Sequence, residues 1–119
     1  MTVNEIQDQV TEEFAMFDDW ISRYDYLIDL GRTLPVIDQK FKTNDYLIEG
    51  CQSKVWLHPD FDGNILSFTA DSDAIITRGI VALLVRVLSG RTPDEIIAAD
   101  LYFIDRIGLR QNLSPTRSN

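Results

Sequence analysis

The amino-acid sequence predicts an α+β fold in a single compact domain that covers residues 1–119. Apolar residues recur at helical spacing in the first third of the chain. Short apolar segments separated by turn residues follow, and a strongly apolar helix comes after them. A chain of 119 residues is long enough to bury a core without disulfides or metal ions. We therefore expect helices packed against a small antiparallel meander of about three strands.

The first two predicted elements form a helical hairpin. Apolar residues recur three or four positions apart through the first third of the chain, as on one face of a helix, namely Ile6, Val10, Phe14, Phe17 and Ile21. Asp18 and Asp19 are expected to cap a second helix that begins near Trp20, because carboxylates bind the first amides and favour the positive end of a helix. Gly31 and Pro35 are expected to end that helix.

The middle of the chain predicts the meander. After a polar connection at residues 36–45, apolar segments at 46–48, 55–57 and 65–69 are expected to be strands, and residues 59–64 form a turn. Asp73 is then the expected N-cap of the most apolar helix, which runs from Ala74 to about Ser89.

The last predicted helix begins with a capping box. Thr92 and Glu95 have the spacing of that motif, with Pro93 at the first helical position. Apolar residues continue as far as Leu109 on another short helix, and the tail at 113–119 is polar.

The charge and the lone cysteine exclude several classes of protein. The net charge of −8 argues against nucleic acid, whose phosphates attract basic surfaces. Residues 1–73 carry 15 acidic and 5 basic side chains, which indicates a solvated acidic face or a surface that attracts a basic partner. No apolar run is long enough for a membrane span, and no signal peptide is visible, so we expect a cytoplasmic protein. One cysteine permits neither an internal disulfide nor a cysteine-based metal site.

Cys51 is the first candidate for chemistry. Gly50 precedes it and the small polar residues Gln52 and Ser53 follow, a pattern typical of a turn rather than of a packed thiol. The amides of Gln52 and Ser53 are expected to support a thiolate, the nucleophilic form of cysteine. Because no second cysteine exists, any sulfur chemistry must pass between molecules.

Other constellations are weaker. His58 is the only histidine and forms a possible hydrolase dyad with Cys51, although no residue that would orient it is evident. The lysines lie in polar segments that do not suit pyridoxal phosphate, and no metal-ligand spacing is present. Asp71 and Asp73 are interpreted as turn and cap residues.

Four ordered blocks of the sequence resemble the SufE family of sulfur acceptors for cysteine desulfurases. The block around Cys51 at 50–56 matches the family signature, and the segments at 30–35, 71–79 and 113–118 match its other motifs. The resemblance implies a fold similar to the IscU scaffold proteins. Members continue past the arginine motif into a final helix, whereas this chain stops at Asn119, so we expect that helix to be lacking.

The resemblance also implies a function. Cys51 would accept persulfide sulfur from a pyridoxal-phosphate-dependent desulfurase of SufS or CsdA type, stimulate that enzyme, and pass the sulfur to an iron–sulfur scaffold of SufBCD type. The pyridoxal phosphate would belong to the partner, and this chain would be an accessory protein without a cofactor. Asp73 would lie near the partner interface, and Arg117 would organise the loop or contact the partner. The alternatives are an allosteric activator whose cysteine is incidental, and a Cys51–His58 hydrolase.

Overall fold

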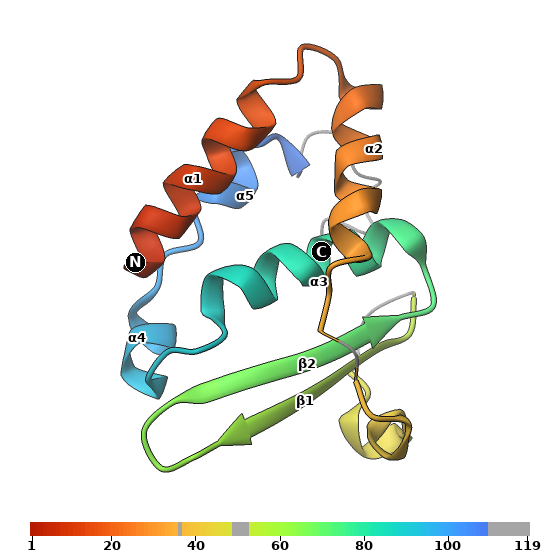
Figure 1. Cartoon of the computed structure of the whole chain (residues 1–119), viewed down its shortest axis with the longest axis vertical. Coiled ribbons are helices and arrows are strands. Elements are labelled where there is room, and N and C mark those ends of the chain that lie inside the picture. The colour runs from red at the N-terminus through yellow and green to blue at the C-terminus, as the bar shows by residue number, and fades with distance from the viewer. Residues whose placement is uncertain (36, 49–52, 110–119) are drawn as a thin grey trace.

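A computed structural model describes residues 1–35, 37–48 and 53–109 of the chain. Its helices are α1 (Val3–Ala15), α2 (Trp20–Gly31), α3 (Ile75–Leu88), α4 (Pro93–Ala98) and α5 (Phe103–Arg106). Two short 3-10 helices, η1 (Gln39–Phe41) and η2 (Asn44–Tyr46), precede the strands β1 (Val55–Phe61) and β2 (Leu66–Ser72). Helix α3 lies between the α1–α2 pair and the β-hairpin (Figure 1). The expected α+β class is confirmed.

The sheet is a two-stranded hairpin rather than the expected three-stranded meander. β1 and β2 pair antiparallel from Val55↔Ser72 to Phe61↔Leu66. The predicted first strand is reduced to an isolated bridge between Leu47 and Trp56. The reason is local: the Tyr46 amide donates to Thr43 O at 3.1 Å and closes a 3-10 turn, so little extended chain remains before residue 49.

β1 is longer than the sequence predicts and includes Pro59. The pyrrolidine ring lacks an N–H, but β1 is an edge of the described sheet, where a missing donor is tolerated. The turn contracts accordingly. Asp62 Oδ1 accepts the amides of Asn64 and Ile65 at 2.8 and 2.7 Å, and Gly63 adopts a φ of 99°.

The helical caps follow the sequence closely, with one exception. Asp19 caps α2 by accepting the Ser22 amide, and Thr92 with Glu95 forms the capping box of α4. The exception is α3, where the expected cap at Asp73 is wrong. β2 continues to Ser72, and Ala74 occupies the N-cap position without a side-chain hydrogen bond. The short helix expected among the apolar residues before Leu109 is present as the four-residue α5.

The α2–α3 crossing forms the centre of the fold. Its closest point is at Gly79, where an added Cβ atom would lie 2.2 Å from the carbonyl oxygen of Leu27. Gly31 lies on the same crossing, and a Cβ atom there would lie 3.0 Å from the Gly79 nitrogen. Backbones this close leave no room for side chains. The crossing brings the buried Leu27 and Leu83 into one apolar core with α1 and α5.

Two polar groups brace this core. The buried Gln7 side chain donates to Asp100 O at 2.9 Å and accepts the Phe103 amide at 3.2 Å, which ties α1 to the C-terminal helices. Glu13 joins three helices, because it accepts from Tyr26 on α2 and from Arg86 on α3. Burial and the neighbouring Glu13 raise the pKa of Tyr26 to about 12.

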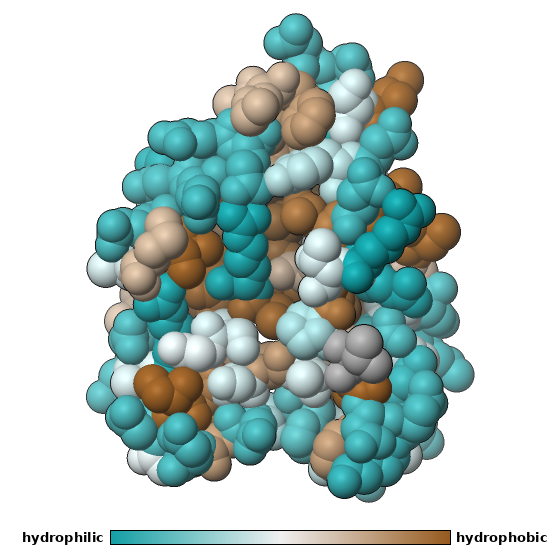
Figure 2. Space-filling view, in the orientation of Figure 1, coloured by the Kyte–Doolittle hydropathy of each residue, from teal (hydrophilic) through white to brown (hydrophobic). Residues whose placement is uncertain are grey.

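One face of the molecule is hollowed. Figure 2 shows apolar side chains at the floor of a hollow between the hydrophilic ridges of α1 and α2. At the C-terminal end of α2, a cleft of about 350 Å³ is lined by residues that include Leu30, Leu34, Leu83 and Arg86.

Candidate functional site

The segment that carries Cys51 is bordered by two described arms. We call residues 37–48 the upstream arm and residues 53–55 the downstream arm. The amide of Ile48 donates to Val55 O at 2.9 Å, and the bridge between Leu47 and Trp56 is antiparallel. The two arms therefore lie side by side at the end of the hairpin. Gly50, Cys51 and Gln52, which connect them, lie outside the described residues, as does Arg117.

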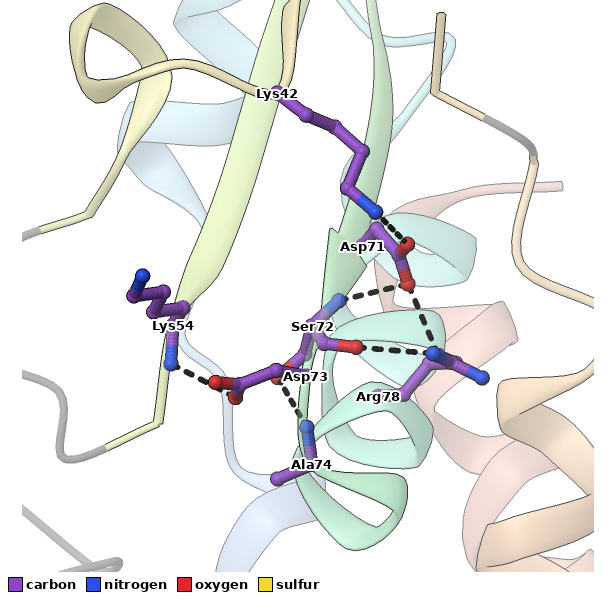
Figure 3. A network of polar contacts seen from close by, with 7 residues as sticks. All are labelled: Lys42, Lys54, Asp71, Ser72, Asp73, Ala74 and Arg78. Carbon is purple, nitrogen blue, oxygen red and sulfur yellow. Dashed lines mark hydrogen bonds and ion pairs between the residues drawn. The ribbon is translucent and has the colours of Figure 1, made fainter. Parts of the chain in front are cut away.

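Asp73 fastens the downstream arm. Its Oδ1 accepts the Lys54 amide at 2.9 Å (Figure 3). Its own amide donates to Lys54 O at 3.2 Å. This reciprocal pair explains why Asp73 does not cap α3: its carboxylate binds an amide of the arm instead of an amide of the helix. Asp73 thus borders the segment that carries Cys51.

Ser53 is the predicted loop residue that the structure describes. It is half-buried, and its hydroxyl lies 3.5 Å from that of Thr77, in the first turn of α3. The downstream arm is therefore close to α3 as well as to the end of β2.

Asp71 is the centre of the polar network in Figure 3. Its Oδ2 accepts from Lys42 Nζ at 3.0 Å, and its Oδ1 accepts from Arg78 Nε at 2.9 Å and from the Ser72 amide at 2.8 Å. Arg78 also donates to Ser72 O at 3.0 Å. One carboxylate on β2 thus contacts the upstream arm and α3 together.

The electrostatics of Asp71 favour its ionised form. Burial opposes ionisation, since the Asp71 side chain is only 24% exposed. The hydrogen bonds from Lys42 and the Ser72 amide, together with the charges of Arg78 and Lys42, outweigh that penalty and lower the pKa of the carboxyl below its usual value. Asp71 therefore remains a charged acceptor at neutral pH.

An aromatic cluster covers the outer face of β1 beside this network. The ring of His58 stacks on Phe41 with centroids 3.6 Å apart, and the edge of Tyr46 packs against it. Lys42 Nζ lies 4.8 Å from the centroid of Trp56. Among the described residues, no hydrogen bond reaches the His58 imidazole, so no carboxylate there orients it as a general base would require.

Apolar surface lies close to the two arms. A cleft of about 170 Å³ between the hairpin and α3 is lined only by apolar residues, which are Ile48, Val55, Leu57, Phe68, Val81, Leu84, Val85 and Leu88. Ile48 is 41% exposed, and Ile75 at the start of α3 is 60% exposed. This end of the molecule presents apolar side chains together with the polar network.

The described part of the chain shows neither a metal site nor a membrane span. Within it, no group of three or more His, Cys, Asp or Glu side chains is placed to hold a metal ion. No helix in the same ranges has the length and apolar character needed to cross a bilayer.

Comparison with known proteins decides the family. The model of the family described as "SufE: Fe-S metabolism associated domain" matches residues 8–119. The chain belongs to the SufE family. An uncharacterized SufE-like protein of Rhizobium etli is 43% identical to this SufE chain over 94% of its length and 79% of the relative. The SufE-like protein 1, chloroplastic/mitochondrial, of Arabidopsis thaliana is 38% identical over 93% of this chain and 30% of the relative.

A solved structure supports the fold independently. The solution structure of a hypothetical protein from Thermus thermophilus matches this SufE chain with a TM-score of 0.74. The match covers 95% of this chain and 82% of that protein, at 19% sequence identity. The similarity confirms the overall fold, and the family match places the chain in Fe–S metabolism.

Sequence reasoning missed the network around Asp71. Asp71 was expected to form a turn, and neither Lys42 nor Arg78 was singled out. One signal was available: Asp71 and Asp73 flank Ser72, so a strand there would point both carboxylates to the same side. Residues 1–73 contain only five basic side chains, so that part of the sequence offers few possible partners for the two carboxylates.

Proposed function

We propose that this SufE-family chain accepts sulfur on Cys51 from a pyridoxal-phosphate-dependent cysteine desulfurase of SufS or CsdA type. It thereby stimulates the desulfurase and passes the sulfur to an iron–sulfur assembly scaffold of SufBCD type. The observation that carries the proposal is the SufE family match across residues 8–119, a range that includes the only cysteine of the chain. The proposal places the protein in the cytoplasm, where thiols are kept reduced.

The transfer needs no external oxidant or reductant. The Cys51 thiolate attacks the outer sulfur of a persulfide on the desulfurase, and a new S–S bond forms on Cys51. The S–S bond of the donor breaks, and the donor cysteine leaves as a thiolate. The proton on the outer sulfur moves with that sulfur to Cys51, so atoms and charge balance. Passing the sulfur to the scaffold repeats the same exchange.

The surroundings of the two arms support access by a partner. Ile48 in the upstream arm and Ile75 at the start of α3 are exposed, as expected for apolar contacts that a second protein covers. We place the pyridoxal phosphate in the desulfurase. In this chain Lys42 is committed to Asp71, and the exposed Lys54 and Lys40 lie on open surface rather than in an enclosed pocket.

Intact mass spectrometry tests the proposal directly. The full chain is incubated with a desulfurase and cysteine, and we expect a mass increase of about one sulfur atom that a reductant removes. The Cys51→Ser variant should gain no sulfur. Desulfurase turnover is measured in parallel, and it should rise with the wild type but not with the variant.

Two outcomes would redirect the assignment. Stimulation of turnover that survives Cys51→Ser would support an allosteric activator with an incidental cysteine. Hydrolysis of an ester or amide by the chain alone, lost in both Cys51→Ser and His58→Ala, would support a hydrolase. Sulfur acceptance that is unaffected by His58→Ala would remove His58 from the mechanism.

A further inference from the structure

Two carboxylates at the end of β2 hold the two arms in different ways. Asp73 contacts the backbone of the downstream arm, through the reciprocal pair with Lys54. Asp71 contacts a side chain of the upstream arm, through Lys42. Both arms therefore contact the same short stretch at the end of β2 (Figure 3). Each of them borders, in the sequence, the segment that carries Cys51.

Lys42 connects Asp71 to the aromatic surface of β1. Its ammonium group lies 3.0 Å from Asp71 Oδ2 and 4.8 Å from the centroid of Trp56. Trp56 and Asp71 are cross-strand partners, and Trp56 also bridges to Leu47 of the upstream arm. The Lys42 and Asp71 side chains are 25% and 24% exposed, so solvent screens their attraction less than that of a fully exposed pair.

Arg78 fixes the other side of the carboxylate. It donates to Asp71 Oδ1 and to Ser72 O, so the Asp71 side chain is anchored to α3 independently of Lys42. A preorganised acceptor loses little conformational freedom when Lys42 contacts it. Asp71 therefore links α3, the end of β2 and the upstream arm.

We propose that Asp71 is a positioning residue for sulfur acceptance, which acts by holding Lys42, and with it the upstream arm, against the end of β2. This inference rests on the proposed role of Cys51 as the acceptor. Through Lys42, Asp71 holds the upstream arm, which leads to Cys51 in the sequence, and this contact affects how readily the Cys51 thiolate meets a reagent or a donor persulfide.

Alkylation of Cys51 by iodoacetamide tests this inference without a partner protein, since the chain has one thiol. Second-order rates are measured across pH in Lys42→Gln and Asp71→Asn. At the high-pH plateau, where the thiol is ionised, we expect rates that differ from the wild type by roughly three-fold or more, as for groups coupled in one network. The double variant should differ from the wild type no more than the single variants do, and Lys42→Arg should restore the wild-type rate.

Lys40→Gln is the matched control. Lys40 lies two residues away on the same arm; its ammonium group lies 5.0 Å from the centroid of the Phe41 ring and forms no ion pair with the described residues. Its alkylation profile should coincide with that of the wild type. A change in melting temperature for Lys42→Gln with a plateau equal to that of Lys40→Gln would overturn the inference. A shifted midpoint with an unchanged plateau would overturn it too, because Lys42 would then act through its charge on the thiol.

The test separates this inference from the proposed function. If the wild type accepts no sulfur from a desulfurase, the proposed function fails, whatever the alkylation rates show. If the wild type accepts sulfur and Lys42→Gln matches Lys40→Gln in both alkylation and the desulfurase concentration needed for half-maximal transfer, only the positioning role fails.

Discussion

The α2–α3 crossing and the end of β2 both hold distant segments together, but they do so by opposite means. At the crossing, Gly79 lets two helix backbones meet with no room for a Cβ atom. At the end of β2, Asp71 and Asp73 hold the two arms through hydrogen bonds and charge. The stability of a close-packed contact depends on side-chain volume and not on pH. The stability of a partly exposed polar network depends less on volume and changes with protonation.

The largest expected effect lies at the crossing. Gly79→Ala should lower the free energy of unfolding by roughly 3 kcal/mol or more, because a backbone carbonyl 2.2 Å from the new Cβ atom cannot move aside cheaply. Urea unfolding followed by circular dichroism measures the loss.

Gly90→Ala is the control for this substitution. Gly90 has a φ of 78° with open space around it, so the new methyl group meets only backbone strain, which costs about 1–2 kcal/mol. Equal losses for the two variants would show that steric contact does not dominate at the crossing.

Asp71→Asn should produce the next largest effect. The amide keeps the shape of the side chain but loses the charge that Lys42 and Arg78 share, which should cost about 1–3 kcal/mol at neutral pH. Urea unfolding measures this loss as well, with Asp60→Asn as the control for an exposed carboxylate on the neighbouring strand. A loss no larger than that of Asp60→Asn would remove Asp71 from the stabilising network.

The pH dependence of that loss sharpens the comparison. The pKa of Asp71 is lower in the folded protein than in the unfolded chain, so its contribution is fully present above the ordinary carboxyl pKa and is lost as the pH falls through the folded value. The stability difference between wild type and Asp71→Asn should therefore shrink below about pH 4. The Gly79→Ala difference should stay constant over the same range. A constant Asp71→Asn difference would contradict the charge argument.

The contrast also explains what could be predicted from the sequence. Helices α2 and α3 and the start of α4 were predicted within a few residues, because periodicity and caps such as Asp19 and Thr92 are local signals. The cap at Asp73 was predicted wrongly because its carboxylate can accept either an amide of α3 or the Lys54 amide. The β1–β2 register, which pairs Val55 with Ser72, brings the Lys54 amide to it. The Asp71 network was missed because Lys42 is 29 residues away in the sequence.

The strand predicted at residues 46–48 is absent for a related reason. Tyr46 has the apolar, aromatic character of a strand residue, but the turn that starts at Thr43 includes it. Competition between a local turn and a distant partner strand is decided by the whole fold. The roles of Gly50, Cys51, Gln52 and Arg117 come from motif resemblance and stay predictions, since these residues lie outside the described ranges.

The smallest expected effect belongs to Asp73. It is exposed, so Asp73→Ala should change global stability little. The Lys54 amide would lose its acceptor, however, and its hydrogen exchange should become roughly two- to five-fold faster, because exchange reports local opening. Asp73→Asn keeps a side-chain oxygen and should protect the amide nearly as well as the wild type. Equal exchange in all three proteins would mean that the Lys54 carbonyl and the Asp73 amide hold the downstream arm alone, and that the carboxylate contributes nothing there.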